Sequence, residues 1–140
     1  MKEEAILKAA KKLFSKFGFK KVSMDEIARE VGVTKKTVYA NFSSKEYLLN
    51  ELIKYELKSM KNEFESIENK SDDFFEGIEQ GLISLLVFRK KNNLFKVLFE
   101  EAEVLRNKSL VNSIKFIEKD VINYISEKLN EAQKKRIYYF

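Results

Sequence analysis

The sequence lacks four residue types altogether: cysteine, histidine, proline and tryptophan. Without cysteine and histidine, the chain cannot form disulfides, zinc fingers or histidine-ligated metal sites, and it cannot use histidine as a general base. Only four glycines occur in 140 residues, whereas strand-rich folds need turn residues at regular intervals. We therefore expect an all-α fold with no cofactor, no metal and no catalytic site. An enzyme built on carboxylates or lysines is compatible with the composition, but no such cluster has a convincing spacing.

The chain also lacks a long apolar run. Its longest stretch is Leu85–Phe88, extended by Leu82 and Ile83, whereas a membrane-spanning helix needs about 20 apolar residues. Charged side chains from Lys2 onward interrupt the N-terminal region, which therefore does not resemble a signal peptide. These features predict a cytoplasmic, soluble protein with no membrane partner.

Positive charge is concentrated in the first third of the chain. Residues 1–48 contain 11 Lys and Arg against 6 Asp and Glu, whereas residues 49–140 contain 16 of each kind. The whole excess of +5 therefore lies in the first segment. A lysine-rich solvated surface would explain this equally well, but the localisation favours a polyanionic partner.

Apolar residues recur at helical spacing along most of the chain. Ile6, Leu13 and Phe17, for example, lie on one face of the first expected helix. The same spacing predicts seven helices, over residues 3–17, 23–31, 35–42, 44–68, 72–90, 93–107 and 109–136. Gly18 and Gly32 follow the first and second of them, where a left-handed residue commonly ends a helix.

Two Ser-x-x-Glu sequences predict capping boxes. In this motif the serine hydroxyl accepts a hydrogen bond from the amide of the glutamate, whose carboxylate reaches back to the serine amide. The pairs are Ser23 with Glu26 and Ser43 with Glu46. Thr34 is a third candidate for an N-cap, before residues 35–42.

Residues 23–42 have the anatomy of a helix-turn-helix. A short helix ends at Gly32, which supplies a turn conformation that residues with a Cβ disfavour, and Ala28 is small where the second helix would cross closest. The remaining faces of that second helix carry Lys35, Lys36, Thr37, Tyr39, Ala40 and Asn41. Lys and Asn can bind base edges, and Lys, Thr and Tyr can hold phosphates. A plain helical hairpin shares the pattern, so the residues alone leave both interpretations open.

The first third of the chain resembles the DNA-binding domain of the TetR (tetracycline-repressor-like) family of transcriptional regulators. The resemblance includes the spacings between its parts, which are Ile6, Ala9-Ala10, Leu13-Phe14, Gly18-Phe19, Val22 to Ala28, and VGVTKKTVYANFSSKEYL from Val31 to Leu48. It implies a helix-turn-helix DNA-binding domain over residues 1–48. It also implies a helical regulatory domain over residues 49–140, with the helix after residue 44 connecting the two.

The resemblance also assigns roles to individual residues. Residues 35–42 match the recognition helix, and Phe42 matches a core aromatic. The expected DNA-binding residues are Ser23, Thr34, Lys35, Lys36, Thr37, Tyr39, Ala40, Asn41 and Lys45. Among them, Thr37, Tyr39 and Lys45 match positions that usually hold phosphates, and Ser23 matches a capping residue that often adds another. Positions 35, 36, 40 and 41 match those that face bases.

The implied function is that of a sequence-specific transcriptional regulator. The expectation is a repressor that binds a palindromic DNA operator as a homodimer and is released by an apolar or amphipathic small molecule. Candidate pocket residues are Phe75, Leu82, Leu86, Phe95, Phe99 and Phe116. An aromatic stripe at helical spacing is more often core than pocket, so the pocket rests on the resemblance alone. Two alternatives stay open: a constitutive DNA binder without an effector, and a helical protein-interaction module or enzyme.

Two features of the second half bear on partners. The expected helix over 109–136 has a broad apolar side, and residues 137–140 add an apolar end. Family members usually continue further, with the dimer formed by their last two helices, so we expect this region either to self-pair or to pack under helices absent from the chain. Acidic Glu100, Glu101 and Glu103 are expected to form a solvated face, with steering of a cationic ligand as the alternative.

Overall fold

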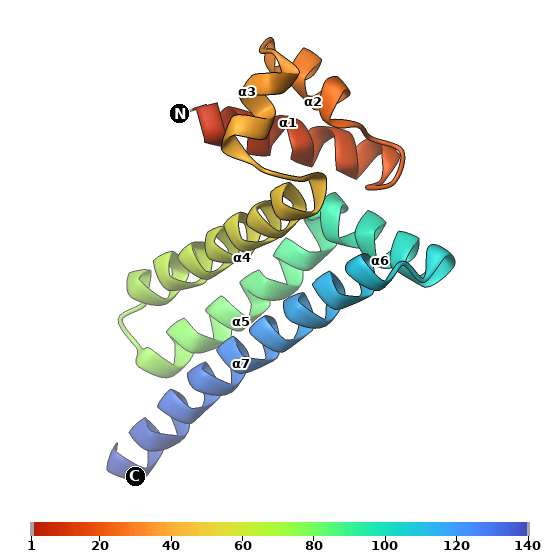
Figure 1. Ribbon diagram of the computed structural model, residues 1–140. Helices are drawn as coiled ribbons and strands as arrows, with labels where there is room; N and C mark the ends of the chain where they lie inside the picture. Colours follow the sequence, from red (N-terminus) through yellow and green to blue (C-terminus); the bar gives the residue numbers. More distant parts are fainter. Residues whose placement is uncertain (1, 140) are drawn as a thin grey trace. The chain divides into compact units, whose positions relative to one another are not determined.

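The structure is a computed structural model that describes residues 2–139, with the side chains of residues 137–139 left out. The described residues form seven helices and no strand (Figure 1). The helices are α1 (Lys2–Phe17), α2 (Met24–Val31), α3 (Lys35–Asn41), α4 (Lys45–Lys70), α5 (Phe74–Lys91), α6 (Asn93–Leu105) and α7 (Lys108–Tyr139). The expected all-α fold is therefore confirmed. No helix of the described chain is both long and apolar enough to cross a membrane.

Helix ends are fixed by local side-chain and backbone chemistry. Gly18 and Gly32 adopt φ values of 86° and 87°, in the left-handed region that favours glycine. Asn92 begins α6 because its side-chain oxygen accepts from the Phe95 amide at 3.1 Å. Asn107 begins α7 in the same way, accepting from two backbone amides.

One predicted cap is wrong. Ser43 was expected to pair with Glu46 in a capping box, but the cap of α4 is Ser44, whose hydroxyl accepts from the Tyr47 amide at 3.0 Å. The motif selected Ser43 because Glu46 lies three residues later, but the hydroxyl of either serine can cap the helix. In the observed helix, which begins after Ser44, Leu48 is fully buried.

The chain divides into two compact units. The first contains the residues up to Tyr55 together with Asn92–Ile114, and the second contains Glu56–Lys91 with the residues from Lys115 onward. These packed units do not test the functional boundary expected at residue 48, which stays a prediction.

The first unit is built on α1. Helices α2, α3 and α6 all contact it, and Figure 1 shows α2 and α3 gathered over one side of α1. Its core contains side chains that are at most 1% exposed: Ile6, Ala10, Phe14, Val22, Ile27, Val38, Leu48, Leu49, Leu52, Ile53, Leu94, Leu98 and Leu110. This apolar burial holds the short helices α2 and α3, which have too few residues to be stable alone.

The second unit packs the last part of α4 with α5 and most of α7. Phe64 of α4 lies edge-to-face on Tyr124 of α7, with ring centroids 5.4 Å apart. Lys128 of α7 reaches Glu68 of α4 at 3.1 Å. Burial raises the pKa of Tyr124 to about 12, aided by the carboxylates of four nearby glutamates.

Candidate nucleic-acid interface

Helices α2 and α3 form the predicted helix-turn-helix. The turn closes on Ala28, whose carbonyl accepts from the amides of Gly32 and Val33 at 2.9 and 3.0 Å. Ala28 itself is 3% exposed, which fits its expected place in the tight helix crossing. The turn is therefore defined by backbone hydrogen bonds around one left-handed glycine.

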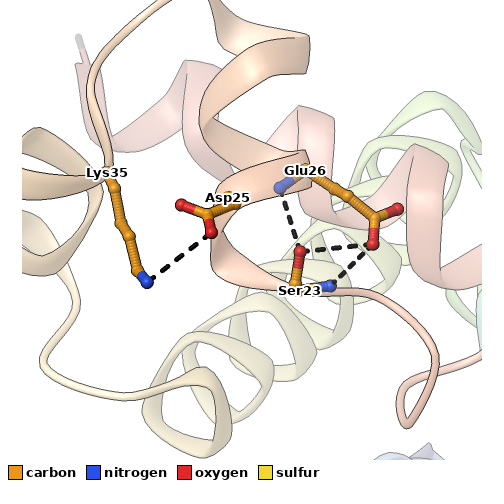
Figure 2. Close-up of polar contacts among 4 residues, drawn as sticks. All are labelled: Ser23, Asp25, Glu26 and Lys35. Atoms are coloured by element: carbon orange, nitrogen blue, oxygen red, sulfur yellow. Dashed lines mark hydrogen bonds and ion pairs between the residues drawn. The ribbon is translucent and has the colours of Figure 1, made fainter.

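The start of α2 carries the capping box predicted from the sequence (Figure 2). The Glu26 amide donates to the Ser23 hydroxyl at 3.1 Å, and the Glu26 carboxylate accepts from the Ser23 amide at 3.4 Å. The exposed hydroxyl of Ser23 also donates to that carboxylate at 3.2 Å. The capping role of Ser23 is therefore confirmed, and its contact with a phosphate stays a prediction.

An ion pair joins α2 to α3. The Lys35 ammonium lies 3.6 Å from the Asp25 carboxylate, as Figure 2 shows. Both side chains are more than half exposed, so solvent screening limits this pair to about 0–1 kcal/mol. Lys35 also lies 5.9 Å from the centre of the Tyr39 ring. The weak pairing leaves its charge available to another anion.

Helix α3, which the resemblance matches to a recognition helix, is oriented by one buried and one capping residue. Val38 is fully buried, which turns the opposite side of the helix outward. Thr34 caps the helix by accepting from the Thr37 amide at 3.2 Å, and the hydroxyls of the two threonines lie 3.0 Å apart. Lys36, Tyr39 and Ala40 are all exposed. Of the residues predicted on α3, Lys35 is exposed with these three, whereas Thr37 is half-buried.

Asn41 is the exception among the residues expected to face bases. Its side-chain nitrogen donates to the Thr37 carbonyl one turn earlier, at 2.8 Å, and the residue is half-buried. This hydrogen bond occupies one of its two N–H donors, and its side-chain oxygen carries none of the described hydrogen bonds. Bidentate recognition of adenine would require this amide to turn away from its own helix.

Lys45 lies elsewhere, at the start of α4. Its ammonium donates to the carbonyls of Phe19, Val22 and Lys20 at 2.7, 2.9 and 3.3 Å. It also lies 4.3 Å from the centre of the Phe19 ring. Burial lowers the pKa of the Lys45 amine, against the opposing effect of the carboxylates of Glu46, Glu101 and Glu26. Since an ammonium has three N–H donors, the expected phosphate contact would require Lys45 to give up a carbonyl.

One residue of this region was missed by reasoning from the sequence. Glu101 of α6 was expected to lie on a solvated face, yet its carboxylate accepts from the amides of Phe19 and Lys20 at 2.7 and 2.9 Å. The adjacent Glu100 is exposed, as expected. Three acidic residues close together, Glu100, Glu101 and Glu103, gave no signal in the sequence that one of them turns inward to the backbone.

The candidate pocket residues do not form one cluster within either unit. Phe95 and Phe99 stack on α6 in the first unit, with ring centroids 6.5 Å apart. The other four lie on α5 and α7 in the second unit, where Leu86 and Phe116 are 68% and 46% exposed. A pocket formed by these residues stays a prediction.

Comparison with known proteins places the chain in a family. The family model for bacterial regulatory proteins of the tetR family matches residues 6–52. HTH-type transcriptional regulator YhgD of Bacillus subtilis is 32% identical over 133 residues, which cover 95% of this chain and 70% of YhgD. Among other relatives the covered share is smaller, 23% of YerO from the same organism.

Comparison with solved structures leads to the same family. A crystal structure from Shewanella sp. PV-4, assigned to the tetR family, has a TM-score of 0.71 and 25% identity, covering 96% of this chain and 71% of that one. A Clostridium perfringens protein assigned to the regulation of fatty acid metabolism has a TM-score of 0.53 and 26% identity, covering 94% of this chain and 87% of that one. The chain therefore belongs to the tetR family of bacterial regulatory proteins, whose members are DNA-binding transcriptional regulators with a helix-turn-helix.

Proposed function

We propose that the chain binds a palindromic operator as a homodimer, with α3 in the major groove, and represses transcription by occluding a promoter. The observation that carries this proposal is the outward surface of α3, where Lys36, Tyr39 and Ala40 are exposed while Val38 is buried. The excess charge of residues 1–48 favours the same partner. A single half-site gives modest affinity, so two copies of α3 are needed, about 34–36 Å apart or a multiple of that spacing.

Selection of DNA from a random pool tests this function directly. Purified protein should enrich a motif with two inverted half-sites whose centres lie on the same face of the duplex. A variant carrying both Lys36→Ala and Tyr39→Ala should lose the enrichment while retaining its helical circular dichroism. Absence of a motif for the parent protein, or an identical motif for the variant, would contradict recognition by α3.

We also propose that residues 49–140 bind an apolar or amphipathic effector that releases the DNA. Support comes from the family, and from the structural neighbour assigned to the regulation of fatty acid metabolism. Thermal shift against a panel of fatty acids and other apolar compounds tests the idea, with DNA release measured for each compound that raises the melting temperature. A panel without a stabilising compound would favour the alternative, a constitutive regulator.

A further inference from the structure

The turn between α1 and α2 is held from two opposite chemical sides. Its carbonyls, at Phe19, Lys20 and Val22, accept hydrogen bonds from the ammonium of Lys45. Its amides, at Phe19 and Lys20, donate to the carboxylate of Glu101. One cation at the start of α4 and one anion of α6 therefore satisfy the polar backbone of the same short segment, all within the first unit.

This segment needs such partners because it is irregular and partly buried, with Lys20 and Lys21 exposed. Phe19 and Val22 are 4% and 1% exposed, so polar groups of their backbone have little access to water, and a buried group without a partner is costly. Gly18 begins the turn with φ of 86°, and a Cβ added there would lie 3.2 Å from a carboxylate oxygen of Glu101. The absence of a side chain at Gly18 thus leaves room for the Glu101 carboxylate to reach the neighbouring backbone amides.

A second contact fixes α6 beside the end of α1. The side-chain nitrogen of Asn93 donates to the Ser15 carbonyl at 3.1 Å. Since Asn93 and Glu101 are eight residues apart on α6, two places about two turns apart on this helix bind the end of α1 and the turn that follows it. The position of α6 is thereby coupled to the backbone that leads into α2 and α3.

We propose that Glu101 and Lys45 are positioning residues for DNA binding, which hold the α1–α2 turn between them and act on α2 and α3 through it without contacting DNA. The inference rests on the proposed DNA-binding function. Hydrogen bonds between backbone groups and a charged side chain are stronger than those between neutral partners, so loss of either charge loosens the turn. Glu101 lies within residues 49–140, which were predicted to be regulatory, yet it would serve DNA binding by residues 1–48.

The direction in which operator affinity changes on substitution of Glu101 separates a positioning role from simple charge repulsion. Removing a carboxylate near a DNA-binding surface should strengthen DNA binding, because repulsion from the phosphates falls. If Glu101 positions the turn, Glu101→Gln should instead weaken operator binding by about tenfold, the scale of one lost charge-assisted hydrogen bond. The matched control is Glu100→Gln, which removes the adjacent exposed carboxylate and should leave affinity equal or slightly higher.

Lys45 is tested by the salt dependence of operator affinity. A residue that holds a phosphate contributes about 0.9 to the slope of log affinity against log salt. We expect Lys45→Met to weaken binding while leaving the slope unchanged, because no phosphate contact is lost. Lys45→Met combined with Glu101→Gln should bind about as weakly as either single variant, since both act on one turn.

Hydrogen exchange supplies a readout that does not depend on DNA. In Glu101→Gln the amides of Phe19 and Lys20 should exchange faster while those of α2 stay protected. Failure of the parent protein to bind any DNA would refute the proposed function and with it the functional part of this inference. The hydrogen-exchange measurement would still test whether Glu101 holds the α1–α2 turn. Increased affinity of Glu101→Gln, a flattened slope for Lys45→Met, or unchanged exchange at Phe19 and Lys20 would each overturn the proposal.

Discussion

Gly81 of α5 lies directly against the ring of Phe64 of α4. A Cβ built on Gly81 would lie 2.7 Å from the Cζ atom of Phe64, a separation that side chains do not adopt. Phe64 is fully buried and its ring also contacts Tyr124 edge-to-face, so it has little room to move. Close approach of α4 and α5 in the second unit therefore depends on the absence of a side chain at position 81.

The first prediction follows from this contact. Gly81→Ala should lower the free energy of unfolding by about 1–3 kcal/mol through overpacking, even though alanine favours helix by about 1 kcal/mol over glycine. Urea denaturation measures the change. Gln80→Ala, at the exposed neighbouring position, is the control and should be neutral. A Gly81→Ala protein as stable as the parent would show that Phe64 can move aside.

The second prediction concerns the ion pair of Lys128 and Glu68. Lys128 is 8% exposed, and its ammonium lies 5.2 Å from the centre of the Phe64 ring as well as 3.1 Å from the Glu68 carboxylate. Lys128→Met should cost about 3–5 kcal/mol, because the methionine fills the space but leaves the carboxylate without its main partner.

Matched substitution of both residues separates charge from packing in that pair. Lys128→Met combined with Glu68→Gln should recover much of the stability, since no unpaired charge is then left. Lys134→Met, at an exposed position on the same helix, serves as the control in the same urea titration. Equal loss for the single and the double variant would mean that packing of the lysine stem, rather than charge, stabilises the unit.

The third prediction concerns the turn of the helix-turn-helix. Gly32 has φ of 87°, and a Cβ there would meet no atom within 4 Å, so backbone strain is the only cost of adding one. Gly32→Ala should destabilise the protein by about 1–2 kcal/mol, whereas Gly32→Asn should cost less because asparagine tolerates the left-handed region. Thermal unfolding ranks the three proteins. Equal melting temperatures for alanine and asparagine would argue against strain.

The fourth prediction concerns base recognition by Lys36. Replacement by alanine should relax the preference at particular base pairs, at a cost of about 1–3 kcal/mol for a good contact. The measurement is operator affinity against a set of single base-pair variants. Lys119→Ala, at an exposed position of α7 in the second unit, removes the same charge and should change no preference. A parallel loss on every sequence would make Lys36 a phosphate ligand instead.

Asn41 gives the fifth prediction, and a smaller effect is expected. Because its side-chain nitrogen already donates to Thr37 within α3, Asn41→Ala should alter base preference less than Lys36→Ala. The same set of base-pair variants measures both. A larger change for Asn41 would indicate that the amide turns outward when DNA binds.

The sequence predicted the local structure of residues 1–48 closely, because short-range chemistry specifies it. The Ser23–Glu26 capping box needs partners only three residues apart, and Gly32 needs only its own φ value to make the turn. Apolar spacing located every helix, with ends within a few residues of those observed. The error at Ser43 arose because both adjacent serines can cap a helix, while only Ser43 has a glutamate at the spacing of a capping box.

The apolar end, residues 137–140, was expected either to self-pair or to pack under further helices, and its side chains lie outside the described part of the structure. The broad apolar side expected on the helix over residues 109–136 is mixed, since Leu110 and Ile117 are buried while Leu129 is 51% exposed. The homodimer and its surface therefore stay predictions.

Sequence alone determined that the chain is all-α and where the short helices of residues 23–42 begin and end, because helical periodicity and capping act between residues a few positions apart. The resemblance to a family identified these helices as a helix-turn-helix. Only the tertiary structure decided the partners of Lys45 and Glu101. Glu101 reaches amides that lie more than 80 residues earlier in the chain, and no local pattern distinguishes it from Glu100 beside it. Which of two like charges turns to a buried backbone depends on where α6 packs against α1, and that packing is a property of the folded unit.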